Sequence, residues 1–285
     1  MTDNPHAVEP LVFGLPDHRI VSLAGRDAGA FAQAQFMNDV AALTVGHWQW
    51  NGWLTPKGRV ITLFALLKLD PDALLLIVAD ADVVALVAQL QRYVFRSKVR
   101  IDVVEDRVVN GSISAPRTAQ ASAFAAGTDR DIELDMSGDG GARTLRIAVE
   151  AGGNDAGAAT RWEAFDLTHG LPRLGETQTE QWTPQQLSLD RLKAYSVKKG
   201  CYPGQEIVAR THFLGQAKRG LVLFDSEQPL HPGSEVREDS TTHGSIVSGA
   251  GSVALAVMAP PQSSQALHVD GVLIRTRPLL SGLAR

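Results

Sequence analysis

The segment KKGCYPGQEIVAR, which runs from Lys198 to Arg210, holds the densest group of specialised residues in the chain. It contains the only cysteine, Cys201, between two glycines, and cationic side chains lie on both sides of it. Glycine permits tight turns and close approach of the backbone, and neighbouring cations favour the thiolate form of a cysteine. The segment therefore predicts a turn that presents one thiol in an electropositive environment.

The same segment also has a purely structural interpretation. Cys201 then fills a turn beside Tyr202, and no histidine follows it closely enough to act as its base until His212. Gln205 and Glu206 either cap the local backbone or face a ligand. The flanking cations are either solvated or bind an anionic ligand.

Composition places the chain among globular proteins. Its 285 residues are 44% hydrophobic and 20% charged, which is enough apolar material for a large core. A formal net charge of −4 argues against a general nucleic-acid binder, although it is compatible with a local basic patch. We therefore expect no stable nucleic-acid binding.

Cysteine content and the apolar runs indicate the cellular setting. One cysteine cannot form an internal disulfide, which favours a reducing compartment. Residues 1–16 lack the basic and apolar regions of a signal peptide, and apolar runs such as 73–78 are too short to span a bilayer. We expect a cytoplasmic protein with no membrane segment. A lone thiolate cannot hold an iron–sulfur cluster, so only a cluster shared with a partner, or bridged between subunits, is compatible with the sequence.

Hydrophobic patterning predicts a chain of mixed α and β structure. Apolar runs at 60–69 and 74–78, split by Asp70-Pro-Asp72, predict a β-hairpin. Apolar residues spaced by four, three and four over 83–94 predict a helix. Short apolar runs between Gly and Pro turns after residue 219 predict a separate small β-domain, perhaps a barrel in form.

Three other segments complete the prediction. Residues 152–159 are expected to form a surface loop, and Thr183-Pro184 to begin a helix. Trp48, Trp50 and Trp53 lie close together in the chain. Such a group could line a pocket for a flat ring, but we expect at least two of the three to pack in the core.

With these residues in view, the chain resembles the YgfZ family of folate-binding proteins, which is similar in fold to the glycine-cleavage T-protein. The family signature Lys-Gly-Cys-Tyr-x-Gly-Gln-Glu is matched by Lys199–Glu206 at every fixed position. Shorter stretches agree in the same order along the chain, at residues 25–28, 38–40, 56–59, 170–173 and 189–190.

The resemblance implies the fold class and its division along the chain. We expect an α+β, T-protein-like folate-binding fold, with two α+β subdomains and a small C-terminal β-barrel around a folate-sized hole. Residues 1–215 would form the folate-binding region and residues 216–285 the barrel. Family members bind tetrahydrofolate and support iron–sulfur proteins, including an enzyme that methylthiolates transfer RNA.

The resemblance also implies roles for individual residues. Trp162 matches the family tryptophan implicated in folate contact, and His18 stands where one branch has a second tryptophan. The catalytic group would comprise Cys201 with Lys199 and Arg210 as its charge partners. The cofactor-binding residues would be Trp162, Tyr202, Gln205 and Glu206.

Two departures bear on the chemistry. The catalytic aspartate of the T-protein would fall near Thr62 or Leu63, where this chain has no acid. The T-protein glutamate that grips the pterin is replaced by Thr168. Both differences argue against aminomethyl transfer.

Our hypothesis is a folate-binding accessory protein that supports iron–sulfur cluster assembly or repair, and thereby tRNA modification, through its signature cysteine. The alternatives are a folate-dependent one-carbon transferase of the aminomethyl type and a non-catalytic scaffold for iron–sulfur enzymes. Whether the protein is an enzyme stays open. Its expected partners are folate and iron–sulfur client or assembly proteins, which it would meet as a monomer.

Overall fold

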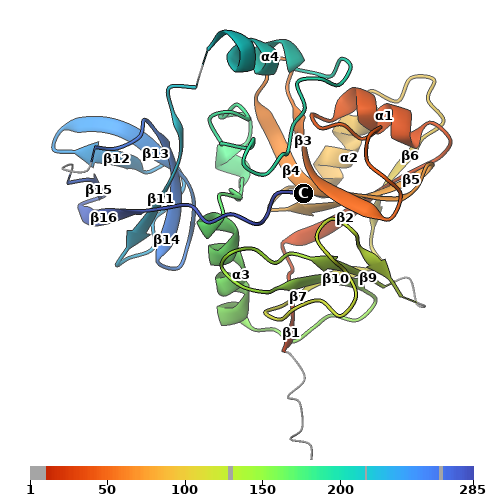
Figure 1. The fold of residues 1–285 in the computed structure, drawn as a ribbon, viewed down its shortest axis with the longest axis horizontal. Helices are drawn as coiled ribbons and strands as arrows, with labels where there is room; N and C mark the ends of the chain where they lie inside the picture. The colour runs from red at the N-terminus through yellow and green to blue at the C-terminus, as the bar shows by residue number, and fades with distance from the viewer. Residues whose placement is uncertain (1–10, 128–130, 216, 263–265) are drawn as a thin grey trace, which may run out of the picture.

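The computed structural model describes residues 11–127, 131–215, 217–262 and 266–285. Part of the stretch used to assess a signal peptide, residues 1–10, lies outside the described residues. Two five-stranded antiparallel sheets lie on one side of helix α3 (Ala156–Thr168), and a closed barrel lies on the other (Figure 1).

The first sheet has the strand order β3-β4-β5-β2-β6. Its hairpin at residues 60–79 agrees with the pattern of the sequence, since β4 and β5 pair around Asp70-Pro-Asp72. Helices α1 and α2 cover one face of this sheet (Figure 1). The bounds are β2 (His18–Ala24), α1 (Ala28–Gln35), β3 (His47–Leu54), β4 (Val60–Asp70), β5 (Ala73–Ala79), α2 (Val83–Gln91) and β6 (Arg100–Val104).

Alternation along β4 decides which side chains face the middle of the molecule. Phe64 and Leu66 pack with the helices, whereas Ala65 and Leu67 belong to the central core. Successive side chains of a strand point to opposite faces, so a strand covered on both sides carries an unbroken apolar run. One face of the sheet is therefore available to form the wall of an internal site.

The second sheet has the order β1-β7-β10-β9-β8. It packs against α3, whose N-cap Asp155 accepts a hydrogen bond of 2.8 Å from the amide of Ala158. Its strands are β1 (Val12–Gly14), β7 (Val108–Ser112), β8 (Ala125–Ala126), β9 (Ile132–Asp135) and β10 (Thr144–Ala148).

The barrel closes in the order β11-β14-β13-β12-β15-β16, with β16 returning to pair with β11. Together with the two sheets it confirms the predicted fold class. The expected boundary between two domains, residues 1–215 and 216–285, stays a prediction. The barrel strands are β11 (Gly220–Ser226), β12 (Glu235–Glu238), β13 (Thr241–Ala250), β14 (Val253–Met258), β15 (His268–Val269) and β16 (Val272–Arg277).

After β16 the chain returns to the two sheets, and the C-terminus lies near the middle of the molecule (Figure 1). The amide of Leu280 donates to the carbonyl of Thr168 at 2.9 Å, and Arg285 Nη2 donates to the carbonyl of Asp135 at 2.9 Å. Trp50 Nε1 donates to the carbonyl of Leu283 at 2.7 Å. We call residues 278–285 the C-terminal strap.

Three local expectations were wrong. Residues 156–159 belong to α3 and not to a loop, because Asp155 caps an alanine-rich run that favours helix. Residues 183–193 form turns in place of a helix, since Ser188 and Lys193 adopt positive φ angles of 48° and 54°. The signature also opens a helix that the pattern did not reveal, α4 (Gln205–Leu214).

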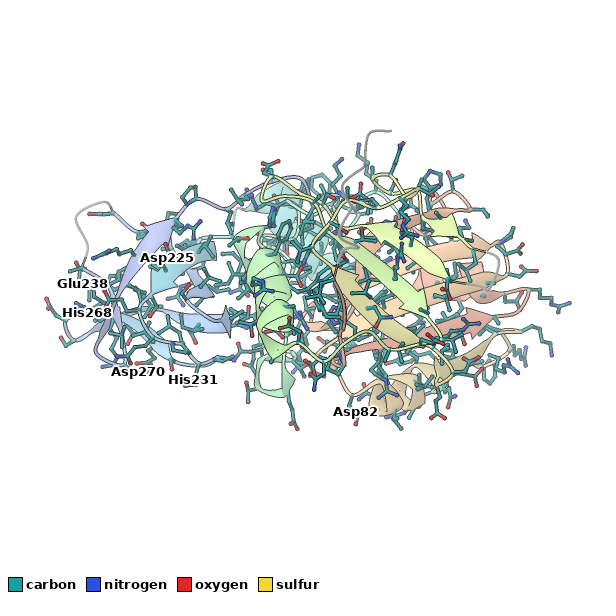
Figure 2. All side chains as sticks on the ribbon, turned by 90° about the horizontal axis from the view of Figure 1, so that it is seen from below. Asp82, Asp225, His231, Glu238, His268 and Asp270 are labelled. Atoms are coloured by element: carbon teal, nitrogen blue, oxygen red, sulfur yellow. The ribbon has the colours of Figure 1, made fainter. Side chains whose placement is uncertain are left out.

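Among the described residues, no helix is long and apolar enough to cross a membrane. No group of three or more His, Cys, Asp or Glu side chains in these same ranges could hold a metal ion. Figure 2 shows Asp225, His231, Glu238, His268 and Asp270 distributed around the barrel, far from Asp82 at the start of α2.

Candidate functional site

A small cavity lies between the two sheets, the end of α3 and the loop that follows it. We call it the central cavity; its volume is about 40 Å³. The first sheet supplies Trp50, Leu63, Ala65 and Ile77 to its wall, and Asp166 reaches it from α3. Its lining is mainly apolar, with a few polar groups, as is usual in sites for small organic ligands.

The polar part of the wall is a buried network of ion pairs. Arg173 donates to both carboxylate oxygens of Asp80 and lies 3.3 Å from Asp166. Arg143, with no solvent exposure, donates to Asp166 at 2.5 Å. Burial works against the charge on Arg173, but Asp80 and Asp166 outweigh it and raise the pKa of this guanidinium above its ordinary value. Both carboxylates are thus held by arginines.

His18 contributes the polar atom of the wall that has no partner. Its Nδ1 is buried and makes no hydrogen bond within the described part of the chain. Burial, and secondarily the charges of Arg173 and Arg143, hold the pKa of His18 well below 6.5. The ring is therefore neutral near pH 7, where Nδ1 can donate or accept according to the tautomer. An unsatisfied buried polar group of this kind points to a ligand or a water molecule.

Two larger pockets adjoin the central cavity. The first, which we call the Arg19 pocket, has a volume of about 520 Å³ and shares His18 with the cavity. The second, which we call the Glu176 pocket, also has about 520 Å³ and shares Asp80 and Leu174 with it. The cavity thus shares one histidine with the first pocket, and one aspartate and one leucine with the second.

In the signature loop, Lys199 has a structural task. Its Nζ donates to the carbonyls of Gln33 at 2.5 Å, Phe36, and Asn38 at 3.2 Å, at the C-terminal end of α1. It also lies 4.8 Å from the ring centroid of Tyr202. Burial lowers the pKa of Lys199 to about 8. A cation that donates hydrogen bonds to the free carbonyls at the C-terminal end of a helix stabilises that end.

Three other signature residues also hold the loop in place. Tyr202 is buried and donates from its hydroxyl to the carbonyl of Ser196 at 3.2 Å. Gln205 Nε2 donates to the carbonyl of Lys199 at 3.0 Å. Gly204 has φ +79°, and a Cβ there would lie 2.6 Å from the Cα of Gly58. These contacts match the capping interpretation of the loop.

The remaining predicted residues of this segment point outward. Cys201, Glu206 and Arg210 are all exposed. Cys201 does not line the central cavity or either adjoining pocket. The signature loop and the cavity are therefore separate places on the molecule.

Asn38 connects these two places. Its Nδ2 donates to the carbonyl of Trp50 at 2.9 Å and to the carbonyl of Lys193 at 2.7 Å. Trp50 forms part of the cavity wall, and Lys199 binds the carbonyl of Asn38 itself. One buried amide therefore joins the cavity wall to the segment that leads into Cys201.

Trp162 lies inside the core. It has no solvent exposure and does not line the central cavity. Its ring packs edge-on against Phe13 with 6.2 Å between centroids, and the guanidinium of Arg143 lies 4.2 Å from its ring. A contact between Trp162 and folate stays a prediction, and it requires Arg143 or the helix to move.

Sequence reasoning missed most of the cavity. Asp80, Asp166 and Arg173 were not identified as site residues, although Arg173 lies in the 170–173 stretch that resembles the family. Trp50 lines the cavity while Trp48 and Trp53 pack in the cores. The wall also includes Leu63, one of the two positions near which the resemblance placed an acid.

No protein-family model matches the chain. It is 26% identical over 254 residues to the tRNA-modifying protein YgfZ of Aliivibrio fischeri, covering 82% of this chain and 79% of that protein. It is 27% identical over 244 residues to the protein of that name from Escherichia coli O157:H7, with coverages of 79% and 74%. An uncharacterized protein of Haemophilus influenzae is 28% identical over 226 residues, with coverages of 78% and 76%.

Among solved structures, the glycine cleavage system aminomethyltransferase T from Bartonella henselae matches with a TM-score of 0.72. The match covers 94% of this chain and 85% of that chain at 15% sequence identity. At this identity the likeness concerns the fold. The resemblance first inferred from Lys199–Glu206 is thus confirmed: the chain is a homologue of the YgfZ tRNA-modifying proteins and has the fold of aminomethyltransferase T.

Proposed function

We propose that this protein binds tetrahydrofolate, or a derivative of it, at the central cavity and acts as a cytoplasmic accessory protein in tRNA modification. It would do so by supporting iron–sulfur cluster assembly or repair, with Cys201 as the reactive group. The observation that carries the proposal is the unpartnered, buried Nδ1 of His18 in the wall of a cavity between the two sheets. The relatives named as tRNA-modifying proteins support the biological setting.

The residues of the cavity suit one edge of a pteridine. Such a ring has apolar faces, which Trp50 and Leu63 can cover, and a polar edge, which a neutral His18 can meet. A bound folate would supply a carrier for one-carbon units. At about 40 Å³ the cavity has room for little more than one water, whose share of liquid volume is about 30 Å³, so the ring enters only as the walls separate.

Cys201 fits a role in exchange with a partner protein. The loop around it is held by buried contacts of Lys199, Tyr202 and Gly204, while its own side chain is exposed. A rigid loop with an accessible thiol can present sulfur to another protein at low entropic cost. Because clusters usually need four protein ligands, the partner would supply the others.

Asn38 offers a physical route between folate and Cys201. It hydrogen-bonds the backbone of cavity residue Trp50 and that of Lys193. Displacement of Trp50 by a ligand would act through this amide on the signature segment. Such coupling requires that the signature segment has two arrangements and that the protein binds folate with different affinity in each of them.

The transferase alternative lacks a free acid in the cavity. Asp80 and Asp166 both lie in its wall, but arginines occupy their carboxylates. A general base must be free to accept a proton from the reacting group. The scaffold alternative is favoured by one feature, the outer surface of α4, where Phe213 and Leu214 are 67% and 82% exposed.

Two measurements test the proposal. Purified protein is titrated with tetrahydrofolate while intrinsic tryptophan fluorescence is followed, and Trp50→Phe should remove most of the ligand-induced change. In cells lacking the protein, the methylthiolated fraction of tRNA is measured after complementation with wild type, Cys201→Ser or, as the matched control, Lys198→Met. We expect the serine variant to fail and the control to succeed.

The outcomes separate the parts of the proposal. Full complementation by Cys201→Ser would remove the thiol from the mechanism. Absence of tetrahydrofolate binding by the wild type would remove the folate role. Turnover of a methylene- or aminomethyl-folate by the purified protein would favour the transferase, and complementation without either folate binding or the thiol would favour the scaffold.

A further inference from the structure

The two outer pockets have the same volume but opposite charge. The Glu176 pocket is lined by Asp80, Asp82, Glu176 and Glu180, and its lining includes no lysine, arginine or histidine. The Arg19 pocket is lined by Arg19 and Arg107 against a single acid, Glu105. A ligand that leaves the central cavity on either side therefore meets very different electrostatic surroundings.

Three of the four acidic residues of the Glu176 pocket, Asp82, Glu176 and Glu180, have no ion pair with a basic side chain within the described residues. Asp82 accepts hydrogen bonds from the amides of Val84 and Ala85 as the cap of α2, which compensates backbone dipoles and adds no positive side chain. Asp80 is paired with Arg173, whose guanidinium is already shared with Asp166. An added carboxylate in this pocket would face like charges on Asp82, Glu176 and Glu180, which costs free energy.

The Arg19 pocket has the opposite character. Arg19 is exposed, and its side chain has no ion pair or hydrogen bond within residues 11–127, 131–215, 217–262 and 266–285. Arg107 adds a second guanidinium, which lies 3.5 Å from Asp131. An unengaged arginine at the mouth of a pocket is well suited to a carboxylate, which it can bind through two parallel hydrogen bonds.

His18 is the point where this pocket meets the central cavity. It is the residue common to both linings, and its Nδ1 is one of the buried side-chain atoms that have no hydrogen-bond partner within the described residues. A ligand that passes from one space to the other must run alongside this ring. A polar group of the ligand at that point would satisfy the orphaned nitrogen, which removes the free-energy cost of leaving it unpaired.

Resting on the proposed folate function, we propose that the glutamate tail of the folate leaves the central cavity past His18 and lies in the Arg19 pocket. Arg19 binds a tail carboxylate there, and His18 hydrogen-bonds the part of the ligand that crosses the junction. The Glu176 pocket does not take the tail. The pocket opens to solvent at Arg19, so additional glutamates can extend outward from it.

The test compares two ligands that differ only in the tail. Wild type and variants are titrated with tetrahydrofolate and with tetrahydropteroate, which keeps the ring and benzoyl group but lacks glutamate. Arg19→Glu should lower the affinity for tetrahydrofolate about tenfold or more, which is the change expected from the loss of one charge-assisted contact. It should leave tetrahydropteroate affinity unchanged.

The matched control lies in the opposite pocket. Glu180→Gln removes one charge from the Glu176 pocket and should alter the affinity of both ligands equally little. Within the Arg19 pocket, Glu105→Gln removes the one carboxylate of the lining. It should raise the affinity for tetrahydrofolate but not the affinity for tetrahydropteroate. These gains and losses should shrink as salt is raised, because exposed charges are screened.

The proposal is overturned if Arg19→Glu binds tetrahydrofolate like the wild type, or if Glu180→Gln selectively strengthens tetrahydrofolate. Thermal melting of each variant, followed by circular dichroism, shows whether it is folded, and Arg19→Gln provides a milder change at the same site. Failure of the proposed function would give a different result, since the wild type would then bind neither ligand.

Discussion

The guanidinium of Arg143 lies 4.2 Å from the ring of Trp162 and donates from Nη1 to the carbonyl of the same residue at 3.0 Å. It also lies 4.1 Å from the ring centroid of Phe165 and pairs with Asp166. A fully buried arginine thus ties α3 to the second sheet through two aromatic rings and one carboxylate. The tryptophan expected to contact folate is, in this structure, part of that assembly.

Replacement of Arg143 by Met should strongly destabilise the protein. The substitution leaves the Asp166 carboxylate, which is 2% exposed, with Arg173 as its remaining charged partner. Breaking a buried pair from one side costs about 3–5 kcal/mol. Urea denaturation measures the change, and Arg100→Met is the control, because its pair with Asp102 is exposed and such pairs contribute about 0–1 kcal/mol. Equal losses in the two variants would contradict this assignment.

The two glycines around Cys201 should respond differently to alanine. At Gly204 the backbone has φ +79°, and a Cβ would lie 2.6 Å from both the Cα of Gly58 and the carbonyl oxygen of Thr55. At Gly200 a Cβ meets nothing within 4 Å. Gly204→Ala should therefore lower the melting temperature and speed the reaction of Cys201 with a thiol reagent, whereas Gly200→Ala should change neither much. The reverse order would show that the loop is not held as described.

Lys199 and Lys198 form a second matched pair. Lys199→Met leaves three backbone carbonyls at the end of α1 without their donor, and an orphaned buried acceptor costs about 1–3 kcal/mol. Lys198 is exposed, so Lys198→Met should be nearly neutral. Chemical denaturation of the two variants measures the difference. If Lys199→Met matched the wild type in stability while abolishing function, the residue would act on the ligand or the thiol and not as a helix cap.

His18 should make stability depend on pH below neutrality. Its pKa in the folded protein lies well below 6.5, so the unfolded chain takes up a proton that the folded one does not. Folding stability is then fully present above pH 6.5 and falls as the pH decreases, by up to about 1.4 kcal/mol per pH unit from this group. Arg173 and Arg143 oppose the imidazolium, and Asp80 and Asp166 are already engaged by them.

His18→Gln should remove this slope while keeping a polar side chain at the junction. Unfolding free energies of both proteins measured between about pH 5.5 and pH 7 give the difference. Burial raises the pKa of the Glu163 carboxyl above 4.5, which gives that group the opposite dependence, and burial lowers the pKa of His169, which adds a dependence of the same sign. Both groups are present in the two proteins, so their contributions cancel in the difference. Parallel curves for the two proteins would mean that the pKa of His18 is the same in the folded and unfolded states.

Local patterns predicted local structure well. The hairpin of β4 and β5 follows from two apolar runs around Asp70-Pro-Asp72, and the short strands after residue 219 indicate the barrel. The errors had two origins, backbone angles that residue types do not reveal and a helix cap that the sequence does contain. The positive φ angles of Ser188 and Lys193 interrupt a segment that begins like a helix, and Asp155 begins one inside a segment that was expected to be a loop.

The sequence by itself determined the relatives of this protein, its class of fold and the glycine-rich turn around Cys201, because glycines within a short span permit such a turn. The tertiary structure alone decided the central cavity. Asp80 and Arg173 are separated by 93 positions and meet only when the sheets and the loop after α3 come together. Periodicity shows which faces of an element are apolar, but it does not show which faces meet. For that reason it could not show that the buried Nδ1 of His18 has no hydrogen-bond partner or that the guanidinium of Arg143 lies against the ring of Trp162. It also could not show that two pockets of opposite charge share residues with one cavity.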